Sequence, residues 1–117
     1  MRLVRVHPDF EADFVAQLDW LVRHREREWI VKLRDGLERV IGLVARFPGA
    51  GTLVDERAGI ALRKVFWPSG PYVAWYIYDQ ASSEGDIWFV RLFHARQTRP
   101  RPDPGKWLPG RRRLARR

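Results

Sequence analysis

The stretch GDIWFVRLFHARQTRP, residues 85–100, changes within a few positions from an apolar run into a cluster of basic side chains. β-Branched and aromatic residues dominate from Ile87 to His94 and favour a β-strand there. Alternate residues of a strand point to opposite faces of its sheet. One face carries Ile87, Phe89, Arg91 and Phe93, and the other carries Trp88, Val90, Leu92 and His94. Because the second set is apolar almost to its end, we expect it to face the rest of the core and Arg91 to point to the open face.

Two further strands are predicted upstream. IALRKVFW (Ile60–Trp67) and YVAWYIYD (Tyr72–Asp79) have the same composition, and the prolines and glycine of residues 68–71 form a clear turn signal between them. Residues 81–86 predict a second turn, so the three strands form an antiparallel meander. Arg63 and Lys64 are neighbours on the first of these strands and must lie on opposite faces. Residues 52–59, before the meander, are predicted to be a loop.

The N-terminal half carries the pattern of two amphipathic helices. A short strand at residues 2–6 precedes Pro8, which suits the first turn of a helix because its missing N–H is no loss there. Apolar residues then recur at spacings of three and four: Phe10, Phe14, Leu18, Leu21 and Val22, and later Trp29, Leu33, Leu37, Val40, Ile41, Val44 and Phe47. Residues 23–28 predict the link, and residues 48–51 end the second helix. The sequence therefore predicts an α+β fold of order β-α-α-β-β-β, with an antiparallel sheet packed against an N-terminal helical hairpin.

Composition and charge limit the class of protein. The 117 residues suffice for one domain, and the absence of cysteine excludes disulfides and thiolate metal sites. Three scattered histidines give no metal-ligand spacing, so we expect neither a metal nor another cofactor. No apolar run approaches the length of a membrane span, and the N-terminus lacks the apolar core of a signal peptide. These features predict a cytoplasmic protein with no membrane contact.

The net charge of +8 is concentrated at the C-terminal end. Residues 97–117 hold eight basic side chains and one acidic side chain, whereas residues 1–96 are nearly neutral. We interpret residues 100–117 as a basic tail rich in proline and arginine, which is either a solvated end or a weak, non-specific contact for nucleic acid. Trp107 and Leu108 interrupt this tail. They are either an anchor, onto the domain or onto a partner, or an incidental apolar spot.

Three local patterns resemble one family. HPDFEADF, YVAWYIYD and IWFVRLFHARQ are similar to the opening strand and acidic helix, the middle strand and the closing strand of the ParE/RelE toxin superfamily of type II toxin–antitoxin systems. The resemblance covers residues 1–99, which would form the toxin domain. It implies a cognate antitoxin that wraps and neutralises the toxin. It also implies one of two targets, because ParE-like members poison DNA gyrase and RelE-like members cleave mRNA in the ribosome.

The RelE-like alternative requires a catalytic site. Metal-independent RNA cleavage needs a base for the 2′-hydroxyl, cations for the phosphate and an acid for the leaving oxygen. RelE-like sites use clustered basic residues on the sheet, commonly with a tyrosine or histidine near the C-terminal end. The candidate members here are Arg63, Lys64, Arg91, His94 and Arg96, with His94 and Arg91 as the catalytic pair. The alternative is that His94 ends its strand in structural hydrogen bonds, and its parity with Val90 and Leu92, which points it toward the helices, favours that role over catalysis.

We favour the ParE-like alternative, in which the toxin catalyses no reaction. Residues 97–99 hold no tyrosine or histidine, and the folded part carries little net charge with which to grip ribosomal RNA. Guanidinium groups bind carboxylates through paired hydrogen bonds, which suits an acidic antitoxin segment or an acidic patch on a target. The predicted binding residues are Arg63, Lys64, Arg91 and Arg96, with Tyr72 and Tyr76 on a tyrosine-lined open face. Trp67, Trp75 and Trp88, on successive strands, are expected in the core.

Overall fold

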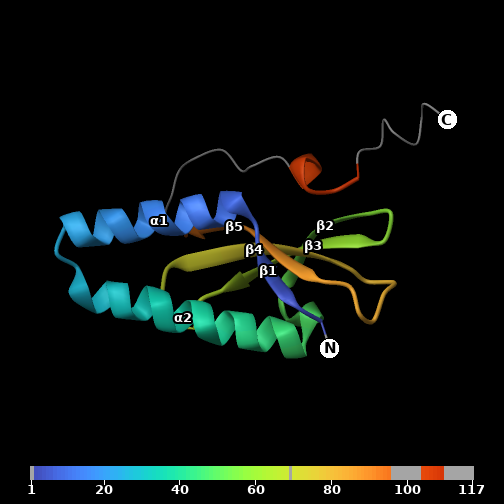
Figure 1. Ribbon diagram of the computed structural model, residues 1–117, viewed down its shortest axis with the longest axis horizontal. Coiled ribbons are helices and arrows are strands. Elements are labelled where there is room, and N and C mark those ends of the chain that lie inside the picture. Colours follow the sequence, from blue (N-terminus) through green and yellow to red (C-terminus); the bar gives the residue numbers. More distant parts are fainter. Residues whose placement is uncertain (1, 69, 96–103, 110–117) are drawn as a thin grey trace.

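The computed structural model describes residues 2–68, 70–95 and 104–109 (Figure 1). The elements follow in the order β1 (Val4–Val6), α1 (Pro8–Arg23), α2 (Arg27–Arg46), the short 3₁₀ helix η1 (Pro48–Ala50), β2 (Thr52–Arg57), β3 (Ile60–Phe66), β4 (Tyr72–Asp79), β5 (Ile87–His94) and the 3₁₀ helix η2 (Pro104–Lys106). The predicted α+β class, the helical hairpin and the three-strand meander are confirmed.

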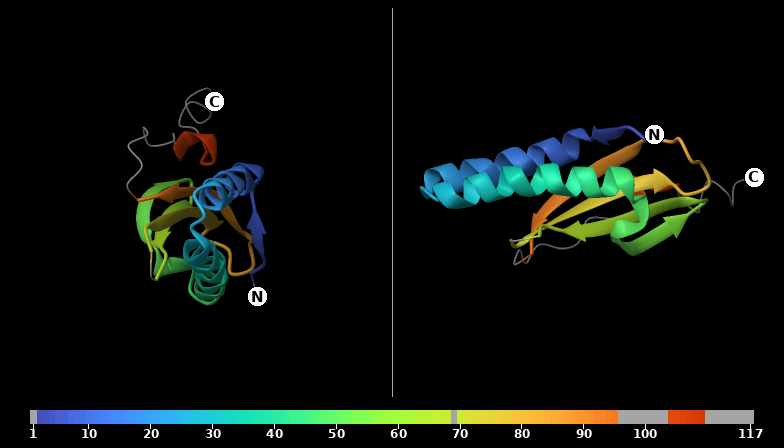
Figure 2. Two further views of the ribbon diagram at one scale, coloured as in Figure 1. Left: turned by 90° about the vertical axis from the view of Figure 1, so that its left-hand side faces the viewer. Right: turned by 90° about the horizontal axis from the view of Figure 1, so that it is seen from below.

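The sheet has five strands in the order β1-β5-β4-β3-β2. β2 to β5 pair antiparallel, whereas β1 pairs parallel with β5. The prediction of a purely antiparallel sheet was therefore wrong at this edge. β1 enters beside the last strand of the meander because the long hairpin carries the chain across the sheet before β2 begins (Figure 2).

The predicted loop at residues 52–59 was also wrong. Residues 52–57 form β2, which turns into β3 through Ala58 and Gly59, both with positive φ (52° and 82°). Two successive residues in this conformation make the tight turn that matches the twist of a two-residue hairpin. The strand escaped detection because it is an edge strand in which no residue is buried, with charged residues at its end.

The helices begin and pack as their sequences dictate. His7 caps α1, since its Nδ1 accepts a hydrogen bond from the Asp9 amide at 3.0 Å. The hairpin lies along one face of the sheet (Figure 2). The helix-side core between them contains Phe10, Leu21, Leu33, Val40, Val44, Ala61, Val65, Trp67, Tyr72, Ala74, Tyr76, Tyr78, Ile87, Phe89 and Leu92. A glycine at position 36 lets α2 approach Trp67, whose Nε1 donates to the Leu33 carbonyl at 3.1 Å.

A bulge in β5 changes which residues share a face. Trp75 lies opposite Arg91 and Tyr76 lies opposite Phe89, so Val90 is an extra residue in the strand. Phe89 before the bulge and Leu92 after it both enter the helix-side core. The predicted alternation was therefore wrong for Ile87 and Phe89, which face the helices, and for Trp88 and Val90, which do not. Trp88, which we expected in the core, is 36% exposed. Val90 joins a smaller open-face cluster on the other side of the sheet: Leu62, Trp75, Val90 and Leu108, with Val54, Ile60, Ile77, Phe93 and Trp107 packed around them.

Candidate functional site

Strand register places two of the predicted cations in one row across the sheet. Lys64 pairs with Trp75, and Trp75 pairs with Arg91, so all three share the open face. Arg63 pairs with Tyr76 on the opposite, helix-side face. As predicted, Arg63 and Lys64 lie on opposite faces, and only Lys64 shares a face with Arg91.

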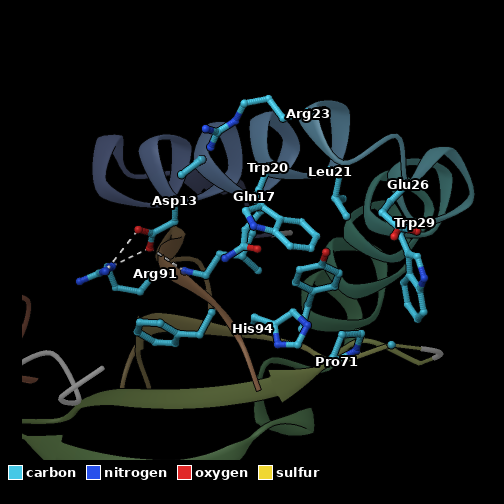
Figure 3. Close-up of a pocket in the computed structure, with 15 residues that line it drawn as sticks. Asp13, Gln17, Trp20, Leu21, Arg23, Glu26, Trp29, Pro71, Arg91 and His94 are labelled. Atoms are coloured by element: carbon cyan, nitrogen blue, oxygen red, sulfur yellow. Dashed lines mark hydrogen bonds and ion pairs between the residues drawn. The ribbon is translucent and has the colours of Figure 1, made fainter. Parts of the chain in front are cut away.

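Arg91 is held by an acid from the hairpin (Figure 3). Its Nε and Nη2 donate to the two carboxylate oxygens of Asp13, at 2.6 and 3.2 Å. The Leu92 amide also donates to Asp13, at 2.9 Å. β1 pairs only with Ile87–Phe89, so the later residues of β5 have no neighbouring strand on this edge. A side chain of α1, that of Asp13, supplies the acceptor that the backbone needs there. The guanidinium that we predicted to hold a partner's carboxylate is thus paired within the fold, with 23% of the side chain exposed.

Arg63 is also engaged within the fold. Its Nη1 donates to the Gly51 carbonyl at 2.8 Å and its Nε donates to the Tyr78 hydroxyl at 3.2 Å. These bonds tie the start of β2 to β3 and β4. The arginine therefore positions backbone, and this role competes with the binding role predicted for it.

Tyr72 and Tyr76 do not form an open tyrosine-lined face. Both are buried in the helix-side core, and burial raises the pKa of each phenol above its ordinary value. The Tyr76 hydroxyl donates to the Pro48 carbonyl at 2.6 Å and accepts from the Gly51 amide at 2.9 Å. The predicted open face is wrong because the helices cover this side of β4 and the η1 segment supplies the partners that let the Tyr76 hydroxyl be buried.

His94 lines a cleft between the hairpin and the ends of β4 and β5 (Figure 3). The cleft has a volume of about 960 Å³, and its lining includes Trp20, Trp29, Tyr72, Arg91 and His94. The His94 ring meets the edge of Tyr72 with 5.5 Å between ring centroids. The predicted catalytic pair, His94 and Arg91, therefore borders one cavity, whereas Lys64 is not among the residues that line it. Arg96, the remaining predicted site residue, lies outside the described residues.

Sequence reasoning missed the residues that α1 and the hairpin turn contribute to this cleft. Asp13 and Gln17 line it, together with Trp20 and Glu26. A signal was present, because Asp13 and Gln17 fall at helical spacing from Phe10 and Leu21, on the stripe that otherwise packs against the sheet. A polar residue on such a stripe indicates a specific partner, and for Asp13 that partner is Arg91.

Residues 2–68, 70–95 and 104–109 contain no group of three or more histidine, aspartate or glutamate side chains that could hold a metal ion. Within the same ranges, neither helix combines the length and apolar character needed to cross a membrane.

Comparison of the sequence with protein-family models returned no match, and comparison with curated proteins returned no significant one. The family resemblance therefore depends on the motifs quoted above.

Proposed function

We propose that this chain is the toxin of a type II toxin–antitoxin system, acts in the cytoplasm and inhibits its target by binding, without catalysis. The proposed target is DNA gyrase and the proposed neutralising partner is a cognate antitoxin. The three quoted motifs support this reading, as does an architecture of the kind that the resemblance implies, a helical hairpin packed on a meander.

The Asp13–Arg91 pair is the observation that carries the proposal. A nuclease site needs cations that are free to stabilise a phosphate, and they must converge on it. Arg91 is instead paired with a carboxylate, Arg63 holds backbone, and Lys64 lies across the sheet from Arg63. These contacts count against an RNA-cleaving site built on the three cations, and they leave Lys64 as the predicted cation for contact with a partner.

The open face offers a surface with suitable chemistry. Phe66 and Phe93 lie on the open face at one end of the sheet, because both pair with Val73, and Phe66 is 54% exposed. The ammonium of Lys64 lies 5.8 Å from the ring centroid of Phe66. An aromatic residue beside a lysine fits a protein segment that combines apolar and acidic side chains.

A supercoiling assay with purified gyrase tests the proposal. The protein should block supercoiling, and Lys64→Ala should weaken the inhibition at least severalfold while Arg39→Ala, at an exposed cation on α2, should leave it unchanged. Equal inhibition by both variants would remove Lys64 from the contact surface. No inhibition at saturating protein would contradict gyrase as the target.

One observation favours a second function, a ribosome-dependent mRNA endonuclease. His94 and Arg91 border the same cleft, where a neutral imidazole could act as the general base. Under this alternative, translating ribosomes yield cut mRNA, and His94→Ala abolishes the cutting. Under the proposal favoured here, mRNA stays intact and His94→Ala keeps its effect on gyrase.

A further inference from the structure

A turn from the C-terminal tail docks on the open face of the sheet. Residues 104–109 lie on the opposite side of the sheet from α2 (Figure 1). The amides of Trp107 and Leu108 both donate to the Pro104 carbonyl, at 3.1 Å each. These bonds close the segment on itself, and a proline stands at each of its ends. We call residues Pro104–Pro109 the strap.

Three consecutive strap residues make the contacts. Leu108 is only 5% exposed and belongs to the open-face cluster with Leu62, Trp75 and Val90. The Trp107 ring meets Trp75 edge to face, with 6.2 Å between centroids and an interplanar angle of 82°. Lys106 Nζ lies 2.7 Å from Asp9 Oδ2 at the start of α1. The surface therefore contacts a cation, an aromatic ring and a leucine, in that order along the chain.

One polar group of the docked strap lacks a hydrogen-bond partner. The indole Nε1 of Trp107 is buried, yet it has no hydrogen-bond partner among the described residues. A buried donor without an acceptor opposes docking, because water satisfies it when the strap is released. Lys106 is 58% exposed, so its ion pair with Asp9 is screened and adds little. Apolar contact with Leu62, Trp75 and Val90 therefore supplies most of the attraction.

We propose that the sheet face around Trp75 is a binding surface for short peptide segments, and that the strap is its displaceable occupant in cis. The ligand class is a segment that presents a cation followed by an aromatic residue and a leucine, as Lys106, Trp107 and Leu108 do. Release of the strap uncovers Leu62, Trp75 and Val90 beside Lys64 and Arg91. This inference stands apart from the identity of the toxin's target.

The test uses the full chain and a capped synthetic peptide, PGKWLP, that copies residues 104–109. The protein variant Leu108→Ser opens the strap, and Leu53→Ser, at an exposed leucine on β2, is the matched control. Binding is followed by the NMR shift of the Trp75 indole. The peptide should bind the opened variant at least tenfold more tightly than the wild type or the Leu53→Ser control, because the strap competes at high effective concentration. A peptide with serine in place of its leucine should not bind.

Three outcomes overturn the proposal. The first is that the peptide does not bind the opened variant, and the second is that it binds the wild type and both variants equally. The third is that the wild type is a dimer and Leu108→Ser is a monomer, which would place the strap on a second copy. Hydrogen exchange of the unaltered protein decides the matter should the variant not fold. The Leu108 amide should exchange at least a hundredfold faster than the most protected amides of β4, and exchange at the same rate would show a strap that opens only with global unfolding.

Discussion

Replacing Asp13 with asparagine tests whether Arg91 is a structural residue. The carboxylate accepts three hydrogen bonds, two from the Arg91 guanidinium and one from the Leu92 amide. Asparagine keeps the shape but has one acceptor oxygen in place of two, and its NH₂ group faces other donors. At least one donor therefore loses its acceptor, and the guanidinium loses its counter-ion.

The expected cost follows from the burial of the pair. Hydrogen bonds to charged groups contribute about 1.5–3 kcal/mol each, and breaking a fully buried ion pair costs about 3–5 kcal/mol. The Arg91 and Asp13 side chains are 23% and 19% exposed, so solvent screens part of this loss. We expect Asp13→Asn to lower the free energy of unfolding by about 2–3 kcal/mol, which corresponds to a fall in Tm of about 10 °C for a chain of this size.

Urea unfolding followed by tryptophan fluorescence measures the effect. Asp19→Asn is the control on the same helix, because Asp19 pairs with Arg23 at 3.4 Å with both side chains more than 60% exposed. Its loss should cost only about 0.3–0.5 kcal/mol. A double-mutant cycle that combines Asp13→Asn with Arg91→Gln should give a coupling energy of about 1–3 kcal/mol between positions 13 and 91. If Asp13→Asn cost no more than Asp19→Asn, the reasoning that assigns Arg91 to the fold would fail.

Three further predictions concern packing and pH. Gly36→Ala should lower the free energy of unfolding by about 2 kcal/mol or more in a urea titration, because the added Cβ would lie 2.0 Å from the indole of Trp67. Gly42→Ala, on the same helix, is the control, because a Cβ there would have nothing within 4 Å. This second substitution should raise the free energy of unfolding by about 0.5–1 kcal/mol. Tyr76→Phe should cost about 1–3 kcal/mol by the same measurement, since the buried Gly51 amide and the partly buried Pro48 carbonyl both lose their partner, and a neutral result would mean that those groups find other partners. The ammonium of Lys106 holds the pKa of Asp9 below its ordinary value of 3.8, so the small contribution of this pair to strap docking is complete above pH 3.8 and is lost as the pH falls through the lower folded-state pKa. NMR signals of the strap should therefore show a small shift toward the released form in this acid range, and Asp9→Asn should remove that pH dependence.

The sequence predicted those elements in which residue composition and hydrophobic period both indicate the same type of secondary structure. The bounds of β4 and β5 matched the structure because uninterrupted β-branched and aromatic runs end at clear turns. β2 was missed because an exposed edge strand needs no apolar alternation. Its pairing also depends on a turn with positive φ at Ala58, and alanine is not a residue that predicts such a turn. The faces of β5 were misassigned because a bulge inserts one residue without any composition signal.

The site was harder to predict than the fold. Arg91 lay on the predicted face, but its partner Asp13 is distant in sequence, and only the path of α1 along the free edge of β5 brings the two together. Tyr72 and Tyr76 were assigned to the open face because they share one face of their strand and a tyrosine-lined surface suits protein contact. Burial became favourable for Tyr76 because backbone groups around η1 satisfy its hydroxyl, a contact that no local pattern encodes.

Titration of purified gyrase with this protein decides whether the chain inhibits a macromolecule by binding alone. We expect a saturable loss of supercoiling that His94→Ala preserves, with mRNA left whole in a parallel translation reaction. Unimpaired supercoiling, together with mRNA that is cut by the wild type and spared by His94→Ala, would show instead that the chain is a nuclease.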